Sequence, residues 1–340
     1  MSSQRLEKSL VLSGCQLREQ TSARKWQILE WTEKPRKLMK APLPFTRREA
    51  SSRGVTRHML LNKARYVQVT HGVWIDDEPE TDIIAPIWAD ESWSKQQVAL
   101  SAMLCADARV VGCNVTAAKL YGLPLPWRAG ADLHVALGRG ASTKRRAGVV
   151  AHRYDRLQSC DFFGLPLVSV PQLFAELAGV LTVEELVVLG DAAVGRWHCG
   201  PLTRIEAIRT ELASRSRLVG RRVAEQAVDL IREDVDSPPE TRLRLRLMAA
   251  GLPEPVVHPA VSCPLIGAVL HPDLGYPEVR LAIEYEGDFH RSSPEQFAED
   301  HRRAAALEAA GWTVLKVMKD SNRAEICRIV EHHLRRGGFL

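Results

Sequence analysis

The sequence predicts a mixed α/β protein built from several domains. Its 340 residues are enough for two or three domains, each with its own core. A hydrophobic content of 45% and a charged content of 26% are those of an ordinary globular protein. Helical and strand patterns alternate along the chain, which favours sheets covered by helices over an all-helical or all-strand fold.

Residues 1–42 are interpreted as a basic N-terminal arm. Residues 1–70 contain fifteen Lys and Arg against five Glu, a local balance of +10, whereas the whole chain carries only +5. Positive charge concentrated in one part of a protein attracts a polyanion. A helix is expected from Ala23 to Trp31, although the sequence indicates no packing partner for it.

A winged helix-turn-helix is predicted over residues 43–80. Thr46 and Glu49 have the spacing of a capping box, and Thr56 is placed to cap a second helix. Two alternating strands follow as a hairpin over residues 66–75. The order helix, turn, helix and hairpin is that of a winged helix-turn-helix.

Such a domain places its second helix in the major groove of DNA. Basic side chains around that helix are expected to contact mainly phosphates, which fix the protein on the duplex. The residues expected to do so are Arg47, Arg48, Arg53, Arg57, Lys63 and Arg65. Small winged-helix units also serve as protein-docking modules, so protein binding is the alternative for this segment.

A separate α/β region is expected over residues 86–232. Helices are predicted over residues 96–106, 116–121, 171–177 and 183–194, and strands over residues 133–137 and 149–153. The sequence Gly138-Arg139-Gly140 lacks both the Gly-Lys-Ser/Thr ending and the following helix of a phosphate-binding loop, so it predicts no nucleotide site. We interpret this region as a scaffold and a surface for a partner.

The segment from Ser237 begins with a strong helix-start signal. The serine can accept a hydrogen bond from an unpaired amide, and proline costs nothing in the first helical turn. Gly251 and Pro253 end the helix. Glu240 has two interpretations that stay open: it completes a capping box with Ser237, or it belongs to an acidic site.

A second strong pattern is the strand LAIEYEG, residues 281–287. Side chains alternate along a strand, so Glu284 and Glu286 point to the same side, about 6.6 Å apart at about 3.3 Å per residue. Asp273 lies eleven residues before Glu284, and an antiparallel return of the chain would bring these two acids together. Alternatively, Glu284 and Glu286 form the solvated face of a half-exposed strand.

Several carboxylates that converge without neutralising lysines repel each other, and a hard cation with oxygen ligands relieves this repulsion. Such an ion can activate water and stabilise a phosphoryl oxygen. The acidic residues therefore favour hydrolysis of a phosphodiester. His290 on its own is more often a surface histidine, and Asp300 with Arg303 has the spacing of an ion pair within one helix.

The C-terminal hundred residues resemble the Vsr-like (very-short-patch-repair) endonucleases of the PD-(D/E)XK superfamily. The resemblance is carried by Ser237-Pro238-Pro239-Glu240-Thr241, Pro272-Asp273-Leu274, Glu284-Tyr285-Glu286-Gly287, His290, Asp300, Arg303, Leu307, Gly311 and Trp312. It implies a restriction-endonuclease-like mixed sheet flanked by helices over residues 233–340.

The same resemblance implies roles for the acidic residues. Asp273 and Glu284 would be metal ligands together with the carbonyl of Tyr285. Glu240 would be an assisting acid, Glu286 would position water or a second ion, and His290 would transfer a proton. The superfamily's lysine is missing, because Glu286 occupies its position. This departure leaves the water-activating role unassigned.

Residues 43–80 and the region after them resemble AbiEi-type antitoxins, on Gly72-Val73-Trp74, on Val111-Gly112 through Leu123 and on Gly164 through Asp191. This resemblance implies a DNA-binding head and a region that can contact a toxin or another protein. It implies no chemistry of its own.

The function expected from the sequence is a DNA endonuclease that depends on Mg²⁺ (or Mn²⁺) and acts in DNA repair, restriction or phage defence. The alternative is an antitoxin-like transcriptional regulator whose nuclease-like domain is inactive, which the absent lysine favours. A cytoplasmic location is expected, because the seven cysteines are scattered without a Cys-x-x-Cys pair and no apolar run reaches the ~20 residues needed to span a bilayer.

Overall fold

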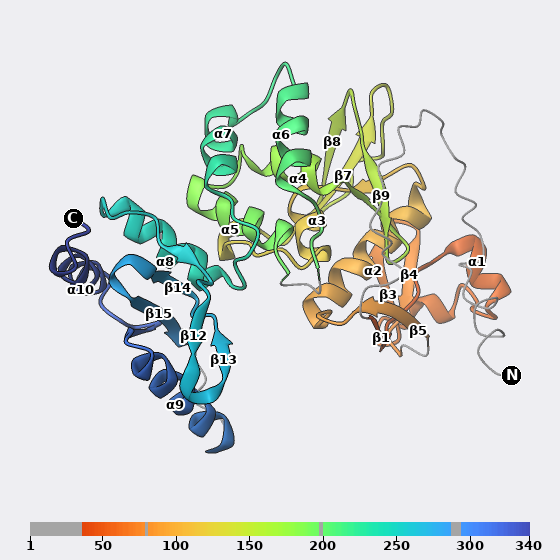
Figure 1. The fold of residues 1–340 in the computed structure, drawn as a ribbon. Coiled ribbons are helices and arrows are strands. Elements are labelled where there is room, and N and C mark those ends of the chain that lie inside the picture. The colour runs from red at the N-terminus through yellow and green to blue at the C-terminus, as the bar shows by residue number, and fades with distance from the viewer. Residues whose placement is uncertain (1–35, 79–80, 197–199, 287–293) are drawn as a thin grey trace, which may run out of the picture. The chain divides into compact units, whose positions relative to one another are not determined.

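The computed structural model describes residues 36–340 except 79–80, 197–199 and 287–293 (Figure 1). Its contacts divide the chain into two units. The first comprises Met1–Gly112, Val135–Leu157 and Asp161–Leu167, and the second comprises Cys113–His134, Gln158–Cys160 and Val168–Leu340. Each unit contains helices and sheets, so the predicted mixed α/β multidomain fold is confirmed. In the part of the chain that is described, no helix has the length and apolarity to cross a membrane.

The predicted winged-helix segment begins as expected. Strand β2 (Phe45–Thr46) leads into α1 (Arg47–Ser52), and β3 (Tyr66–Thr70) and β4 (Val73–Asp76) form a hairpin in a sheet of order β2-β4-β3. Thr46 and Glu49 form the capping box, in which the Glu49 carboxylate accepts from the Thr46 amide at 2.7 Å. Phe45, Ala50 and Tyr66 make the small core.

The prediction of a full second helix from Thr56 is wrong. The segment contains only η2 (Met59–Leu61), a single 3₁₀ turn, although Thr56 Oγ1 does accept from the Met59 amide at 3.3 Å. Asn62 ends this turn, because its side-chain oxygen accepts from the Ala64 amide at 3.2 Å. Asparagine competes in this way with the helical hydrogen bonds of the main chain.

The boundary of the predicted basic arm also changes. Strand β1 (Arg36–Lys40) pairs antiparallel with β5 (Asp82–Pro86), and Lys40 forms an ion pair with Asp82 at 2.9 Å. Residues 36–42 therefore belong to the first unit. The helix predicted from Ala23 to Trp31 lies outside the described residues.

A five-stranded sheet of order β8-β7-β6-β10-β9 lies mostly in the first unit, although residues 133–134, 159–160 and 168 of its strands are assigned to the second. The elements of this region are α2 (Glu91–Ala106), β6 (Val111–Gly112), β7 (Leu133–Gly138), β8 (Val149–Tyr154), β9 (Ser159–Phe162) and β10 (Leu165–Val168). The sheet is mixed, because β6 runs antiparallel to β7 and parallel to β10. A strand follows Gly138-Arg139-Gly140 and no helix does, in agreement with our rejection of a phosphate loop.

The second unit begins with a group of helices. They are α3 (Asn114–Leu120), η3 (Trp127–Ala129), α4 (Val170–Leu177), α5 (Val183–Val194), α6 (Ile205–Ser214) and α7 (Arg221–Leu230). The predicted helices over residues 116–121, 171–177 and 183–194 are thus confirmed. Every residue of helix α5 from 186 to 194 is buried, which explains its continuous apolar sequence.

The C-terminal part of this unit is a mixed sheet of order β11-β14-β15-β16. Its elements are α8 (Pro238–Ala249), β11 (Val256–Val257), β12 (Val261–Cys263), η4 (Pro264–Ile266), β13 (Ala268–Leu270), β14 (Leu274–Tyr276), η5 (Pro277–Val279), β15 (Leu281–Glu286), α9 (Pro294–Ala309), β16 (Thr313–Met318) and α10 (Arg323–Arg336). Strand β14 runs antiparallel to both of its neighbours, β11 and β15, whereas β15 and β16 are parallel.

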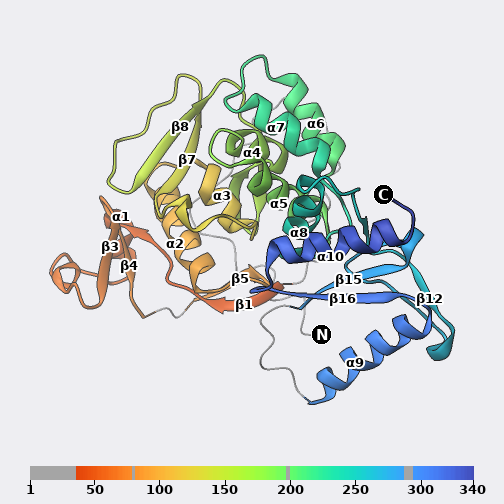
Figure 2. The same ribbon diagram turned by 90° about the vertical axis from the view of Figure 1, so that its left-hand side faces the viewer.

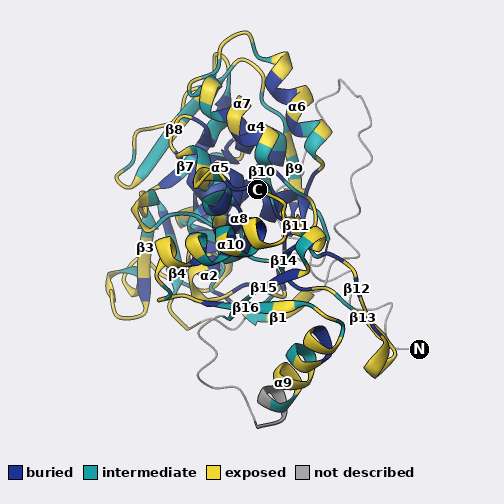
Figure 3. Ribbon diagram, turned by 60° about the vertical axis from the view of Figure 1, so that its left-hand side comes forward, coloured by how far each residue is buried: buried dark blue, intermediate teal, exposed yellow. Residues whose placement is uncertain are grey.

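Helices cover both faces of this sheet (Figure 2). On one face, residues of α8 and α10 pack with Leu281 and Ile283 of β15. On the other, Ala306 and Leu307 of α9 pack with Ala282. Helix α10 buries one apolar stripe and exposes its outer side, as the colouring of Figure 3 shows. The central strand β15 is therefore buried through its first half, and its acidic second half emerges between the helices.

The contacts do not separate residues 86–232 from residues 233–340 at the boundary that the sequence predicted. Helix α8 packs against α5, and both lie in the second unit. Arg244 of α8 is completely buried and donates to Asp191 of α5 at 3.0 Å. Thr241 donates to the same carboxylate at 2.9 Å.

Candidate metal centre

The start of α8 positions Glu240. The hydroxyl of Ser237, the helix N-cap, donates to Glu240 Oε1 at 2.5 Å, and the Asp236 amide donates to Oε2 at 3.2 Å. Only 6% of Glu240 is exposed. Ser237 caps the helix, but the capping box is not completed, because the Glu240 carboxylate accepts from the Asp236 amide and not from the Ser237 amide. The carboxylate is instead held where its Oε2 lies 3.5 Å from His258 Nε2.

Strand pairing places four polar residues in one row across the sheet. The register of β15 with β16 pairs Glu284 with Lys316. Strands β14 and β15 pair Leu274 with Ile283, so the next residues along, Asp273 and Glu284, lie side by side. Strands β11 and β14 pair Val257 with Leu274, so His258 lies beside Asp273 in the same way. The His258 amide donates to the Asp273 carbonyl at 3.1 Å, which supports the last of these pairs.

Asp273 lies at the centre of the candidate site. Its Oδ2 accepts from the Tyr285 amide at 2.7 Å. Burial, and then the negative charge of Glu240, raise the pKa of Asp273 to about 6, and Glu284 acts in the same direction. The expected approach of Asp273 to Glu284 is thus supported by both strand register and electrostatics.

Among the residues that the structure describes, Glu240, His258 and Asp273 bring potential ligand atoms together. One atom from each lies within 4.8 Å of the other two. We call these three residues the Glu240–His258–Asp273 cluster. Its donor set, two carboxylates and one imidazole, fits a divalent cation.

Sequence reasoning missed His258. This residue follows β11 and has a positive φ of 45°, which is uncommon outside glycine. Besides Glu240, its Nε2 lies 3.7 Å from Asp236 Oδ2. The hydrogen bond with Glu240 is the main cause that raises the pKa of His258. No spacing in the sequence marks this histidine, since only the pairing of β11 with β14 brings it to Asp273.

The remaining two acids, Glu284 and Glu286, have basic partners, contrary to the expectation that the carboxylates converge without neutralising lysines. Arg303 of α9 donates to Glu284 Oε1 at 2.8 Å. Lys316 of β16 donates to Glu286 Oε1 at 2.6 Å. The interpretation of Arg303 as an intrahelical partner of Asp300 is therefore wrong, because its guanidinium reaches across to β15 and also donates to the His271 carbonyl.

The other predicted site residues have different outcomes. Tyr285 contributes its amide to Asp273, and its side chain packs against the core formed with α8 and α10. His290 lies outside the described residues, so its expected role stays a prediction.

All six basic residues expected to contact DNA are exposed in the first unit: Arg47, Arg48, Arg53, Arg57, Lys63 and Arg65. Two of them also stabilise the winged-helix segment. Arg53 donates to the Leu43 carbonyl at 3.2 Å and lies over the Phe45 ring. Arg65 forms an ion pair with Asp76 at 3.2 Å.

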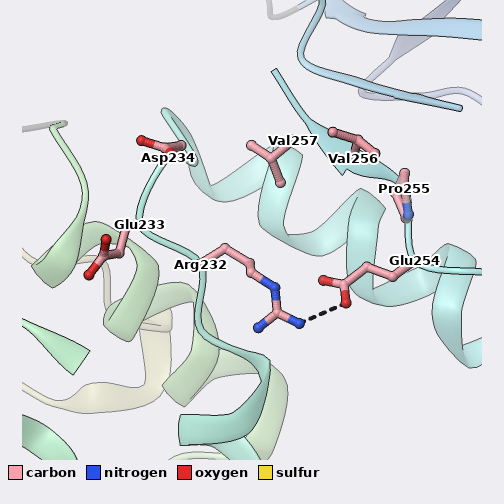
Figure 4. A pocket seen from close by; sticks show the side chains of 7 residues that line it. All are labelled: Arg232, Glu233, Asp234, Glu254, Pro255, Val256 and Val257. Atoms are coloured by element: carbon pink, nitrogen blue, oxygen red, sulfur yellow. Dashed lines mark hydrogen bonds and ion pairs between the residues drawn. The ribbon is translucent and has the colours of Figure 1, made fainter. Parts of the chain in front are cut away.

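A pocket of about 300 Å³ lies near the start of β11 and is shown in Figure 4. It is lined by Arg232, Glu233, Asp234, Glu254, Pro255, Val256 and Val257. Arg232 forms an ion pair with Glu254 at 2.7 Å across it. None of the Glu240–His258–Asp273 cluster lines this pocket, so it is separate from the candidate centre.

Comparison with known proteins finds no protein-family model that matches the chain. The chain is similar to the uncharacterized proteins MT2308 and Rv2248 of two Mycobacterium tuberculosis strains, CDC 1551 / Oshkosh and H37Rv. Each is 25% identical over 276 residues, which cover 79% of this chain and 93% of the relative.

Proposed function

We propose that the protein is a metal-dependent DNA endonuclease that hydrolyses phosphodiester bonds. The observation that carries this proposal is the convergence of one ligand atom each from Glu240, Asp273 and His258 within 4.8 Å of one another. Asp273 is held there by the Tyr285 amide and Glu240 by the start of α8. The resemblance to Vsr-like endonucleases likewise makes Asp273 a metal ligand, whereas it gives Glu240 the role of an assisting acid.

In this proposal, Asp273 and Glu240 bind Mg²⁺ or Mn²⁺, and Glu284 joins them if its contact with Arg303 opens. When bound, such an ion polarises a phosphoryl oxygen and makes water more acidic. Hydrolysis adds the water oxygen to phosphorus and breaks one phosphorus–oxygen ester bond. Lys316 keeps positive charge beside Glu286, in the region where the superfamily's lysine is absent.

The first unit would supply DNA affinity through its exposed basic residues. Residues 36–70 contain nine Lys and Arg against one Glu, and phosphate contacts dominate non-specific affinity for DNA. Because the second helix is a single 3₁₀ turn, insertion of a long recognition helix into the major groove is not part of the proposal. The proposal also includes a cytoplasmic location and a role in DNA repair, restriction or phage defence.

The second candidate is an antitoxin-like regulator with an inactive nuclease-like domain. One observation favours it: Arg303 and Lys316 neutralise two of the acids that the Vsr-like site would use. A toxin or another protein would then bind the helices of the middle region.

Cleavage of supercoiled and linear DNA in Mg²⁺ and in Mn²⁺ tests the proposal. We expect nicking or cutting by the intact chain and a loss of more than a hundredfold in Asp273→Asn and Glu240→Gln. Glu278→Gln is the matched control, because Glu278 is an exposed acid of the same sheet region. Equal inactivity of all four proteins on plain, mismatched and modified DNA would favour the regulator.

A further inference from the structure

His258 is the one member of the Glu240–His258–Asp273 cluster that neither the sequence pattern nor the family resemblance assigns. About one fifth of its side chain is exposed, so an ion could reach the imidazole while the main chain keeps the residue in place. Its ring nitrogen Nε2 faces the Glu240 carboxylate at 3.5 Å. The residue thus adds a nitrogen donor to a set of oxygen donors.

The backbone fixes this histidine from both sides. Its amide donates to the Asp273 carbonyl at 3.1 Å, and its own carbonyl lies 3.2 Å from His271 Nδ1. The left-handed conformation at φ 45° turns the chain sharply where β11 ends. A side chain placed by such main-chain contacts needs little ordering when it binds a ligand.

The nitrogen donor affects which ion the cluster prefers. Mg²⁺ takes oxygen ligands in strict octahedral geometry and gives up its water reluctantly. First-row transition ions accept imidazole together with carboxylates. A cluster with two carboxylates and one imidazole therefore favours the transition ion.

We propose that His258 Nε2, Asp273 and Glu240 bind one divalent cation, and that the imidazole makes this site bind Mn²⁺ more tightly than Mg²⁺. This inference rests on the proposed function only because both place a metal ion at the same residues. It concerns binding and is tested without DNA.

The experiment measures Mn²⁺ binding to the full-length protein by electron paramagnetic resonance, with Mg²⁺ as competitor. Spin-echo spectra of bound Mn²⁺ report directly whether nitrogen is a ligand. The variant is His258→Asn, because asparagine also tolerates the left-handed conformation. His332→Asn, an exposed histidine on α10, is the control.

We expect the wild-type protein and the control to prefer Mn²⁺ by about tenfold or more and to show nitrogen coupling. His258→Asn should lose the coupling and about tenfold in Mn²⁺ affinity, with Mg²⁺ affinity changed less than threefold. A circular dichroism melt would show that the variant is folded.

Three results would overturn the inference: bound Mn²⁺ without nitrogen coupling, equal affinity for the two ions in the wild type, or binding of neither ion. These outcomes differ from failure of the endonuclease proposal. Nitrogen-coordinated Mn²⁺ without DNA cleavage refutes only the activity, whereas cleavage in Mg²⁺ without nitrogen coupling refutes only the role of His258.

Discussion

Arg244 shows how one buried charge can be accommodated in the second unit. Its side chain is fully buried, yet it donates to Asp191 at 3.0 Å, to Glu254 at 2.8 Å and to the Leu230 carbonyl at 2.8 Å. Burial raises the pKa of Asp191 to about 6, and Arg244 opposes this effect by favouring the carboxylate. Arg244 lies four residues after Glu240, so the same helix carries both this network and the candidate site.

Replacement of Arg244 should therefore be costly. Arg244→Met leaves the Asp191 carboxylate buried without its main counter-charge, and we expect a loss of about 3–5 kcal/mol in the free energy of unfolding. Urea denaturation would measure it. Arg242→Met is the control, because Arg242 is exposed and lies 3.8 Å from Glu184, and it should change stability by less than about 1 kcal/mol.

Restoring neutrality should rescue part of this loss. In the double variant with Asp191→Asn and Arg244→Met, no uncompensated charge remains at the α5–α8 contact, so the double variant should be more stable than Arg244→Met alone. Equal stability of Arg244→Met and the wild type would show that the buried pair contributes little.

At the scale of the element, the N-terminal cap of helix α5 combines a local hydrogen-bond pattern with a partner distant in the sequence. Thr182 and Glu185 form a capping box, and Glu185 also forms two hydrogen bonds with Arg128. The hydrogen bonding with Arg128 lowers the pKa of Glu185 to about 2. The cap is local and visible in the sequence, whereas the arginine is 57 residues away.

This lowered pKa predicts a pH dependence of stability. The folded-state pKa lies below the ordinary value of 4.5, so the stabilisation is present above about pH 4.5 and is lost as the pH falls towards 2. Because Arg128 is partly exposed, we expect only about 1 kcal/mol between wild type and Glu185→Gln at pH 6.

The measurement is the urea unfolding difference between these two proteins at pH 6 and at pH 3. The difference should shrink at the lower pH. Glu206→Gln serves as the control, because Glu206 is an exposed acid in the first turn of α6. Its free energy of unfolding should differ from that of the wild type by the same small amount at pH 6 and at pH 3. A wild-type advantage that grows at pH 3 would contradict the assignment.

At the scale of the whole molecule, residues 233–340 depend on the helices before them. Thr241 and Arg244 of α8 both donate to Asp191 of α5. The fragment 233–340 lacks α5 and leaves Thr241 and the buried Arg244 without their partner Asp191. We expect this fragment to unfold without cooperativity, whereas the fragment 168–340 should unfold in one transition.

Circular dichroism melts of the two fragments check this prediction. In the fragment 233–340, Thr241 and Arg244 lose their partner Asp191. A third fragment, 233–340 with Thr241→Val and Arg244→Met, lacks these two unpaired polar groups and should be better folded than the unaltered 233–340. If residues 233–340 were as stable as the longer fragment, the α5–α8 contact would be dispensable.

The winged-helix segment predicts a salt-dependent affinity for DNA. Arg47 and Arg48 are exposed at the start of α1, and each phosphate contact adds about one unit to the slope of log affinity against log salt. The double variant Arg47→Ala, Arg48→Ala should bind a duplex more weakly and reduce that slope by about two.

Fluorescence anisotropy at several salt concentrations measures both quantities. Lys95→Ala is the control, because Lys95 is exposed on α2 and forms an ion pair with Glu91 at 2.7 Å. An unchanged slope in the double variant would mean that α1 does not contact the phosphates.

The sequence by itself determined those features that depend on neighbouring residues. The caps at Thr46 and Ser237 follow from hydrogen bonds three residues apart, and the alternation in Leu281–Glu286 follows from strand geometry. These signals were enough to predict the main helices and the antiparallel approach of Asp273 to Glu284. They overestimated the second helix after Thr56, because Asn62 ends it after one turn.

Only the tertiary structure decided which side chains meet across the sheet. His258 reaches Asp273 through the pairing of β11 with β14, and Lys316 lies beside Glu284 only because β16 runs parallel to β15. Arg303 reaches Glu284 from a helix that packs over the sheet. Such contacts join residues fifteen or more positions apart, and no periodicity of the sequence encodes them, because they depend on how the elements pack around a shared core.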